Sequence, residues 1–253
     1  MERTNACSET TSNKWHLPLL GTVPPDPRPE DYARQAKRWL DACLTAHVDC
    51  CSPPVQELPT RVIDVGNELD DPRLFETAPG AQGIYCTLSY CWGQTRTFTT
   101  TLSTFEDRKK GFGIDELPAT IRDAVVLARG LGIRYLWVDS LCIIQDSSSD
   151  WEYEAARMCS VYNQAAITFA AIDSPASETG LFIAGSDRRL VKLDEQWGPI
   201  YARMHSHSAP DDHRSLPRDE ITSRVLNTRG WCLQELALSS RILWYVHGMI
   251  VPN

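Results

Sequence analysis

The chain has 253 residues, enough for one sizeable hydrophobic core or for one core with a smaller annex. Its 33 acidic and 25 basic side chains give a formal net charge of -8, which argues against nucleic acid as a partner. No apolar run approaches the roughly 18 residues that cross a bilayer, and no signal pattern opens the chain, so we expect a cytoplasmic protein without a membrane span.

The first part of the chain predicts a leader and a lead-in. Residues 1–28 are rich in Ser, Thr, Asn and Pro, which is typical of a flexible leader. Apolar side chains at three-to-four spacing predict a helix over residues 30–44. Short strands are expected at residues 60–65 and 73–76, with an acidic turn between them. Residues 29–80 therefore form a lead-in of one helix and a β-hairpin.

Residues 81–253 are expected to form the core of the domain. The run Tyr85 to Tyr90 is rich in β-formers and predicts a strand. Pro118 opens a helix that ends at Gly130 or Gly132, because proline suits a first helical turn and glycine suits a helix end. A buried strand is expected at residues 134–138. The order strand, helix, strand predicts a βαβ unit with parallel strands and a right-handed crossover.

A second helix is expected after this unit. Ser149 and Glu152 fit a capping box, which predicts the start of the helix at this point. We expect Asp150 and Glu154 to be solvated on its outer face. Its predicted buried face consists of Trp151, Ala155, Met158 and Tyr162.

The remaining segments complete an α/β pattern. Residues 166–171 predict another central strand, residues 228–236 a turn and short helix, and residues 241–245 a final strand. Residues 173–227 are polar and are interpreted as an insertion. Two weak strands are expected within it, at residues 190–193 and 200–203. The whole pattern predicts a mostly parallel sheet flanked by helices.

Cysteine usage predicts neither disulfides nor a metal site. The nine cysteines are an odd number, and several lie in apolar runs where a thiol acts as a small buried hydrophobic group. Cys43, His47, Cys50 and Cys51 are of ligand types that suit zinc. No second cysteine pair with matching spacing follows them, so we predict no metal.

Four segments, in this order and spacing, resemble the HET (heterokaryon incompatibility) family. They are Leu88–Gly93, Leu117–Ala124, Leu131–Asp146 and Arg229–Glu235. The resemblance implies a fungal protein that triggers programmed cell death, a form of innate immunity. The chain stops at Asn253, shortly after the last matching segment, which predicts a minimal or truncated member.

A more distant resemblance is to TIR domains, which have a flavodoxin-like fold. It rests on Leu88-Ser89-Tyr90, on Val138-Asp139 and on the segment from Trp231 to Leu236, in that order. In TIR enzymes the glutamate of this last segment supports cleavage of NAD(P)+. The resemblance therefore implies an NAD(P)+ glycohydrolase with Glu235 as its catalytic carboxylate. Such a carboxylate stabilises the oxocarbenium character that develops on the ribose.

Ligands of such sheets lie outside the carboxyl ends of the strands. Residues that follow two of the predicted strands, and a tryptophan of the last segment, are therefore expected to line a dinucleotide-binding crevice. They are Ser89, Tyr90, Trp92, Gly93, Asp139, Cys142 and Trp231. NAD(P)+ is expected as a substrate, so no bound cofactor is predicted.

Structural roles remain open for these residues. Glu235 also fits a helix cap or an ion pair with Arg229 or Arg241, and Asp139 fits a brace for loop amides. The two tryptophans fit core positions, and Ser89 fits a turn. At the level of function, the alternatives are a signalling module that works by self-association or partner binding, and a nucleotide-binding module without turnover.

Overall fold

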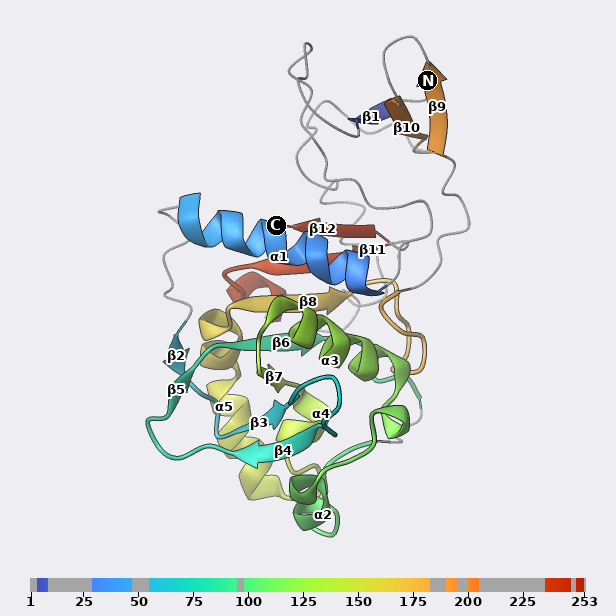
Figure 1. Cartoon of the computed structure of the whole chain (residues 1–253). Coiled ribbons are helices and arrows are strands. Elements are labelled where there is room, and N and C mark those ends of the chain that lie inside the picture. The colour runs from blue at the N-terminus through green and yellow to red at the C-terminus, as the bar shows by residue number, and fades with distance from the viewer. Residues whose placement is uncertain are drawn as a thin grey trace.

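The structure is a computed structural model, and Figure 1 shows the whole chain. The described residues are 4–8, 29–46, 55–94, 98–182, 190–194, 200–204, 235–246 and 249–252.

A seven-stranded mixed sheet forms the centre of the described part of the molecule, in the order β12-β11-β8-β6-β7-β3-β4. Its strands are β3 (Arg61–Asp64), β4 (Arg73–Glu76), β6 (Tyr85–Ser89), β7 (Tyr135–Trp137), β8 (Ile167–Ala171), β11 (Ile242–Val246) and β12 (Met249–Pro252). The four strands β11, β8, β6 and β7 are parallel to one another. At the two ends of the sheet, β12 pairs with β11 and β3 pairs with β7 in the antiparallel sense.

The spatial order of the parallel strands reverses once relative to their order along the chain. Along the chain they follow the order β6, β7, β8, β11, but in space β6 lies between β7 and β8. This is the 2-1-3-4 order of flavodoxin-like sheets, and the reversal between β6 and β8 marks the position where such folds bind ligands. The predicted α/β fold with a mostly parallel sheet is confirmed.

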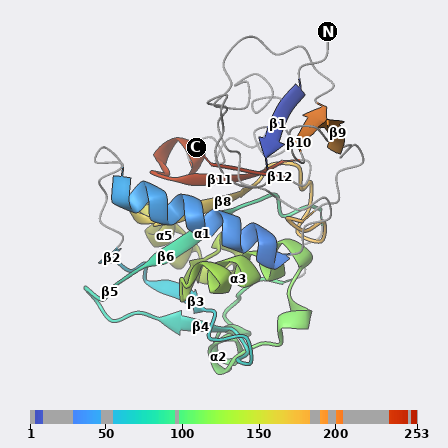
Figure 2. The same ribbon diagram turned by 45° about the horizontal axis from the view of Figure 1, so that its top comes forward.

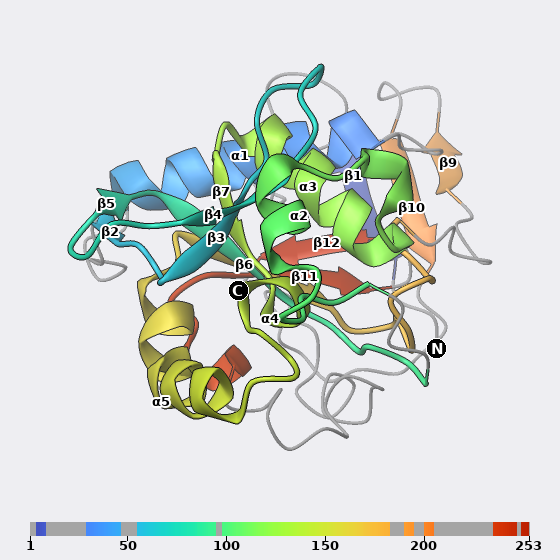
Figure 3. The same ribbon diagram turned by 90° about the horizontal axis from the view of Figure 1, so that it is seen from below.

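Helices cover both faces of the sheet. They are α1 (Pro29–Ala46), α2 (Phe105–Lys110), α3 (Ala119–Leu131), α4 (Asp139–Cys142) and α5 (Ser148–Gln164). Figures 1 and 2 show α1 and α3 side by side on one face, and these two helices pack on each other. Seen from below in Figure 3, α5 lies on the opposite face. Within the described ranges, every helix falls short of the length and apolar character that a membrane crossing requires.

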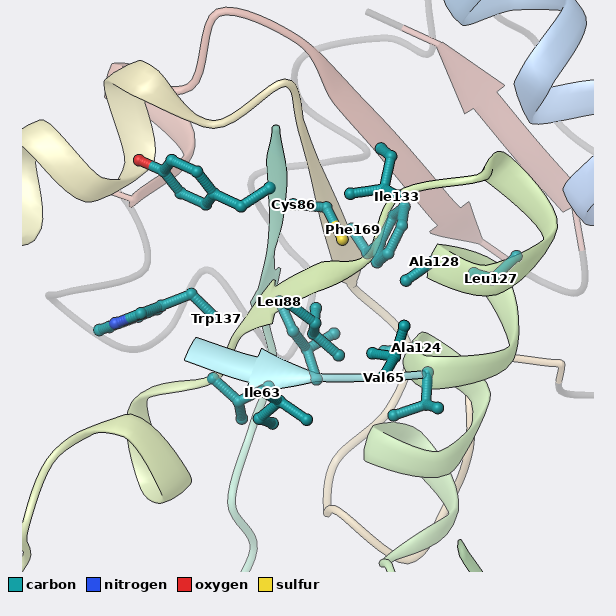
Figure 4. Close-up of a cluster of buried hydrophobic side chains, with 14 of the residues drawn as sticks. Ile63, Val65, Cys86, Leu88, Ala124, Leu127, Ala128, Ile133, Trp137 and Phe169 are labelled. Atoms are coloured by element: carbon teal, nitrogen blue, oxygen red, sulfur yellow. The ribbon is translucent and has the colours of Figure 1, made fainter. Parts of the chain in front are cut away.

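Successive side chains of β6 point to opposite faces of the sheet, so this strand contributes to the core on both faces. Cys86 and Leu88 of β6 lie on the α3 side, with Ala124 and Ala128 of that helix nearby (Figure 4). Tyr85, on the other side of the strand, donates its hydroxyl to the carbonyl of Val161 in α5 at 2.7 Å. All five residues of β6 are buried, as expected for a strand covered on both faces.

The predicted helices and strands are found with small shifts. The helix expected at residues 30–44 is α1, which begins at Pro29 and ends at Ala46. Pro118 precedes α3, and Gly132 ends it in the left-handed conformation with a φ of 74°. The expected strands at residues 73–76 and 166–171 are β4 and β8.

The expected orientation of α5 is wrong only near its start, because Tyr162 is buried and Met158 packs against the core, as predicted. The N-cap is Ser147, whose hydroxyl accepts the amide of Asp150, so the helix begins two residues earlier than the capping box predicted at Ser149. Trp151 is 48% exposed, whereas Glu154 is 1% exposed. The sequence pattern had placed Trp151 inside and Glu154 in solvent.

Arg61 of β3 explains this orientation. Its guanidinium pairs with Asp150 at 2.7 Å and with Glu154 at 3.2 Å, and its Nε donates to the carbonyl of Cys142 at 2.7 Å. A buried guanidinium needs counter-charges, so the two carboxylates turn inward and Trp151, next to Asp150, turns outward.

Outside the main sheet, three strands come together from distant parts of the sequence. β9 (Leu190–Asp194) and β10 (Ile200–Met204) lie at the two expected weak strands, and they form a sheet in the order β1-β10-β9. β1 (Thr4–Ser8) belongs to the segment that was expected to be a flexible leader. A two-stranded ribbon joins β2 (Gln56–Glu57) to β5 (Gln82–Gly83). The rest of the leader and most of the insertion lie outside the described residues.

Candidate functional site

The carboxyl ends of the parallel strands lie at one edge of the sheet. β6 ends at Ser89, β7 is followed by Val138 and Asp139, and β8 ends at Ala171. Because these strands are parallel neighbours, the segments that follow them meet at the same edge. The predicted residues from Ser89 to Gly93 and at Asp139 therefore share this edge.

Glu235 is held at the end of β6. The Ser89 hydroxyl donates to Oε2 of Glu235 at 2.6 Å, across a sequence separation of 146 residues. Ser89 is fully buried, and Glu235 is 7% exposed at the start of a helical turn over residues 235–238. This hydrogen bond holds the predicted catalytic carboxylate at β6, beside the position between β6 and β8 where the strand order reverses.

The backbone of Glu235 is held by a second set of hydroxyl groups. Ser239 donates to the carbonyl oxygen of Glu235 at 2.7 Å. The Ser239 hydroxyl lies 2.7 Å from that of Thr168 in β8, which lies 2.7 Å from that of Thr87 in β6. The sequence reasoning missed these three residues. The available signal was a threonine within each of two buried strands, β6 and β8.

A second group surrounds Asp139. The indole Nε1 of Trp92 donates to both carboxylate oxygens of Asp139, at 3.1 and 2.9 Å, and the amide of Ser140 donates to Oδ1 at 2.6 Å. The buried Tyr90 donates its hydroxyl to Ser140 at 2.8 Å. Asp139 therefore ties the turn after β6 to the start of α4, while Trp92 and Asp139 stay partly exposed.

The segment after β8 packs against the turn after β6. Gly93 has a φ of 82°, and a Cβ there would lie 2.7 Å from the Cβ of Ala176. The hydroxyl of Ser177 donates to the carbonyl of Trp92 at 3.2 Å. Glycine is thus required at position 93 both for conformation and for space.

The same segment is also held by α3. Asp123 of α3 accepts the amide of Leu181 at 2.7 Å, and burial raises the pKa of the Asp123 carboxyl group.

Two predicted site residues do not join these groups. Cys142 is 1% exposed, its Sγ accepts the amide of Val138, and burial raises the pKa of its thiol to about 12. Its side chain belongs to the core rather than to the edge. Trp231 lies outside the described residues, as do His47, Cys50 and Cys51 of the cluster that was considered for zinc.

The family follows from a comparison of sequences. The sequence model described as "Heterokaryon incompatibility protein (HET)" matches residues 85–235, more than half of the chain. The chain belongs to the HET family. No curated protein and no solved structure matches it. HET membership confirms the prediction from the four sequence segments and indicates a heterokaryon incompatibility protein. The resemblance to TIR domains remains a prediction.

The HET match begins and ends at the candidate site. It starts at Tyr85, the first residue of β6, and its last residue is Glu235. It includes the turn from Ser89 to Gly93, Asp139 with α4, and strand β8. The two residues joined by the Ser89–Glu235 hydrogen bond thus lie near opposite ends of the matched segment and meet only in the fold.

Proposed function

We propose that this HET protein hydrolyses the bond between nicotinamide and ribose in NAD(P)+ and thereby triggers programmed cell death in the fungal cytoplasm. The observation that carries the proposal is the hydrogen bond from Ser89 to Glu235 at the carboxyl end of β6. A carboxylate oriented at this edge is the group that can stabilise the positive charge developing on the ribose in a glycosidic transition state.

The strand order supports a dinucleotide as the substrate. In flavodoxin-like sheets, nucleotides bind outside the carboxyl ends of the strands where the order reverses, here between β6 and β8. Trp92, Gly93 and Asp139 lie at this edge and are at least partly exposed. An indole ring suits stacking on nicotinamide or adenine.

The proposed reaction consumes water. The bond between C1′ of the ribose and the pyridinium nitrogen breaks, and nicotinamide leaves with the electron pair and becomes neutral. Glu235 stabilises the positive charge that develops on the ribose. Water then attacks C1′ and loses a proton, which gives ADP-ribose (or its 2′-phosphate), nicotinamide and one proton.

The test is nicotinamide release by the purified protein and its Glu235→Gln variant. Glutamine keeps the shape of the side chain and an oxygen that accepts from Ser89, but it removes the charge. We expect turnover to fall by about 100-fold or more, as is usual when a transition-state charge partner is lost. Glu152→Gln, at an exposed position of α5, is the matched control and should leave turnover unchanged. Equal rates in wild type and Glu235→Gln would remove this carboxylate from the mechanism.

Expression in fungal cells separates hydrolysis from the signalling alternative. Hydrolysis predicts that Glu235→Gln abolishes both killing and the loss of cellular NAD(P)+. If killing persists with Glu235→Gln but is lost in variants that cannot self-associate, the protein acts instead as a non-enzymatic module. Calorimetric binding of NAD+ without product would indicate a nucleotide-binding module.

A further inference from the structure

The face of β6 that looks toward α5 carries polar side chains at alternate positions. Thr87 and Ser89 are two residues apart on this strand, so both point to the same side of the sheet as Tyr85, whose hydroxyl reaches α5. Thr168 is the direct neighbour of Thr87 on β8. Both threonines are fully buried. A valine at either position would fill the same space without a polar group to satisfy, so their hydroxyls require an explanation.

The direction of each hydrogen bond follows from counting protons. A backbone carbonyl only accepts, so the single hydroxyl proton of Ser239 is used toward the carbonyl of Glu235. Thr168 must then donate to Ser239, and Thr87 must donate to Thr168. The three hydroxyls form a chain with one direction, from the middle of β6 across β8 to the peptide group of Glu235.

We infer that Thr87, Thr168, Ser239 and Ser89 are positioning residues for Glu235. The chain of three hydroxyls fixes the backbone of the helical turn, and Ser89 fixes the carboxylate. Both connections start from the same face of β6, two residues apart. Strand β6 therefore sets where the carboxylate stands relative to Trp92, which lies in the turn after β6 and donates to Asp139 at the end of the neighbouring strand β7.

This inference changes the role of Ser89 within the proposed function. As a fully buried residue whose proton is used toward Glu235, Ser89 acts through the carboxylate rather than on the ligand. Ser89→Ala should therefore lower kcat for NAD+ and leave KM within about twofold, because it removes orientation and not a ligand contact. A KM that rises as much as kcat falls would overturn this role of Ser89.

The main test uses Thr168→Val, which keeps the shape and breaks the chain in the middle. Thr168→Ser keeps the hydroxyl and is the rescue variant. Thr77→Val is the matched control, since the hydroxyl of Thr77 donates to the carbonyl of Pro59 at 2.7 Å beside β4, at the far edge of the sheet. We expect kcat to fall roughly tenfold in Thr168→Val only, at unchanged KM, with recovery in Thr168→Ser.

A second measurement does not depend on turnover. Amide hydrogen exchange in residues 236–240 should be roughly tenfold faster in Thr168→Val, and near wild type in Thr168→Ser and Thr77→Val. Exchange in this segment that is unchanged in Thr168→Val, or equally fast in Thr77→Val, would overturn the inference. Absence of nicotinamide release by the wild type would contradict the proposed function alone, and the exchange rates would then decide whether the hydroxyl chain positions Glu235.

Discussion

At the scale of single residues, two buried glutamates differ in what holds them. Glu235 has the neutral hydroxyl of Ser89 on its carboxylate, whereas Glu154 faces the guanidinium of Arg61 at 3.2 Å. Asp150 shares the same guanidinium, so two carboxylates meet one cation. The hydrogen bond from Ser89 orients the Glu235 carboxylate at the carboxyl end of β6, whereas the ion pair of Glu154 with Arg61 lies in the core.

The Glu154 carboxyl group makes stability depend on pH. Burial raises its pKa above the ordinary value of 4.5, and the charge of Arg61 offsets this only in part. The folded state therefore holds this proton more tightly than the unfolded state. The resulting stabilisation is fully present below about pH 4.5 and is lost as the pH rises through the folded pKa, at up to about 1.4 kcal/mol per pH unit.

Glu154→Gln removes this titration and nearly keeps the side-chain volume. We expect the free energy of unfolding of the wild type, relative to that of Glu154→Gln, to decrease as the pH rises from about 4.5 to 7. Urea titrations at several pH values measure this difference. Glu152→Gln, which is exposed, should show no such trend. A difference that increases with pH would mean that the ion pair with Arg61 outweighs burial.

At the scale of elements, the packing of α1 on α3 depends on one small residue. Gly130 lies in the last turn of α3, and a Cβ at this position would clash with the Cβ of Ala33 in α1. Glycine inside a helix costs about 1 kcal/mol relative to alanine, so its presence here reflects the close approach of two helices rather than helix propensity.

Gly130→Ala tests this balance between propensity and packing. Alanine should gain about 1 kcal/mol in helix propensity and lose about 1–3 kcal/mol through overpacking, so we expect a net loss of stability. Ala33→Gly in the same chain should recover part of that loss, and a double-mutant cycle measures a coupling of at least about 0.5 kcal/mol. Stabilisation by Gly130→Ala alone would show that the helices separate at little cost.

At the scale of the whole molecule, the segment that matches the HET model contains only part of the main sheet. β3 and β4 lie before residue 85, and β11 and β12 lie after residue 235. β11 is the parallel neighbour of β8, and β3 pairs with β7. Arg61, the partner of Asp150 and Glu154, also precedes the match. The matched segment thus depends on flanking strands for both edges of its sheet.

A fragment of residues 85–235 should not fold by itself. It would expose both edges of a three-stranded sheet and would leave the two carboxylates of α5 without Arg61. We expect no cooperative urea transition by circular dichroism, whereas a fragment of residues 29–252 should unfold cooperatively. A cooperative transition of the shorter fragment would show that the matched segment is stable without its flanks.

Local sequence determined most of the elements of this protein. Runs of β-branched and aromatic residues predicted β6, β7 and β8, and Pro118 with Gly132 marked the ends of α3, because these signals act within a few residues. The four HET segments identified the family, and the order of the strands indicated where a site would lie. Ser89, Trp92 and Asp139 could be selected on that basis.

Tertiary structure alone decided which of these residues touch. Periodicity placed Glu154 in solvent because it is charged, and only the approach of Arg61 from β3 explains its burial. The pairing of Thr87 with Thr168 depends on the register between two strands that are 81 residues apart, and the hydrogen bond of Ser89 to Glu235 spans 146 residues. Such contacts form when the sheet assembles, and no local pattern records them.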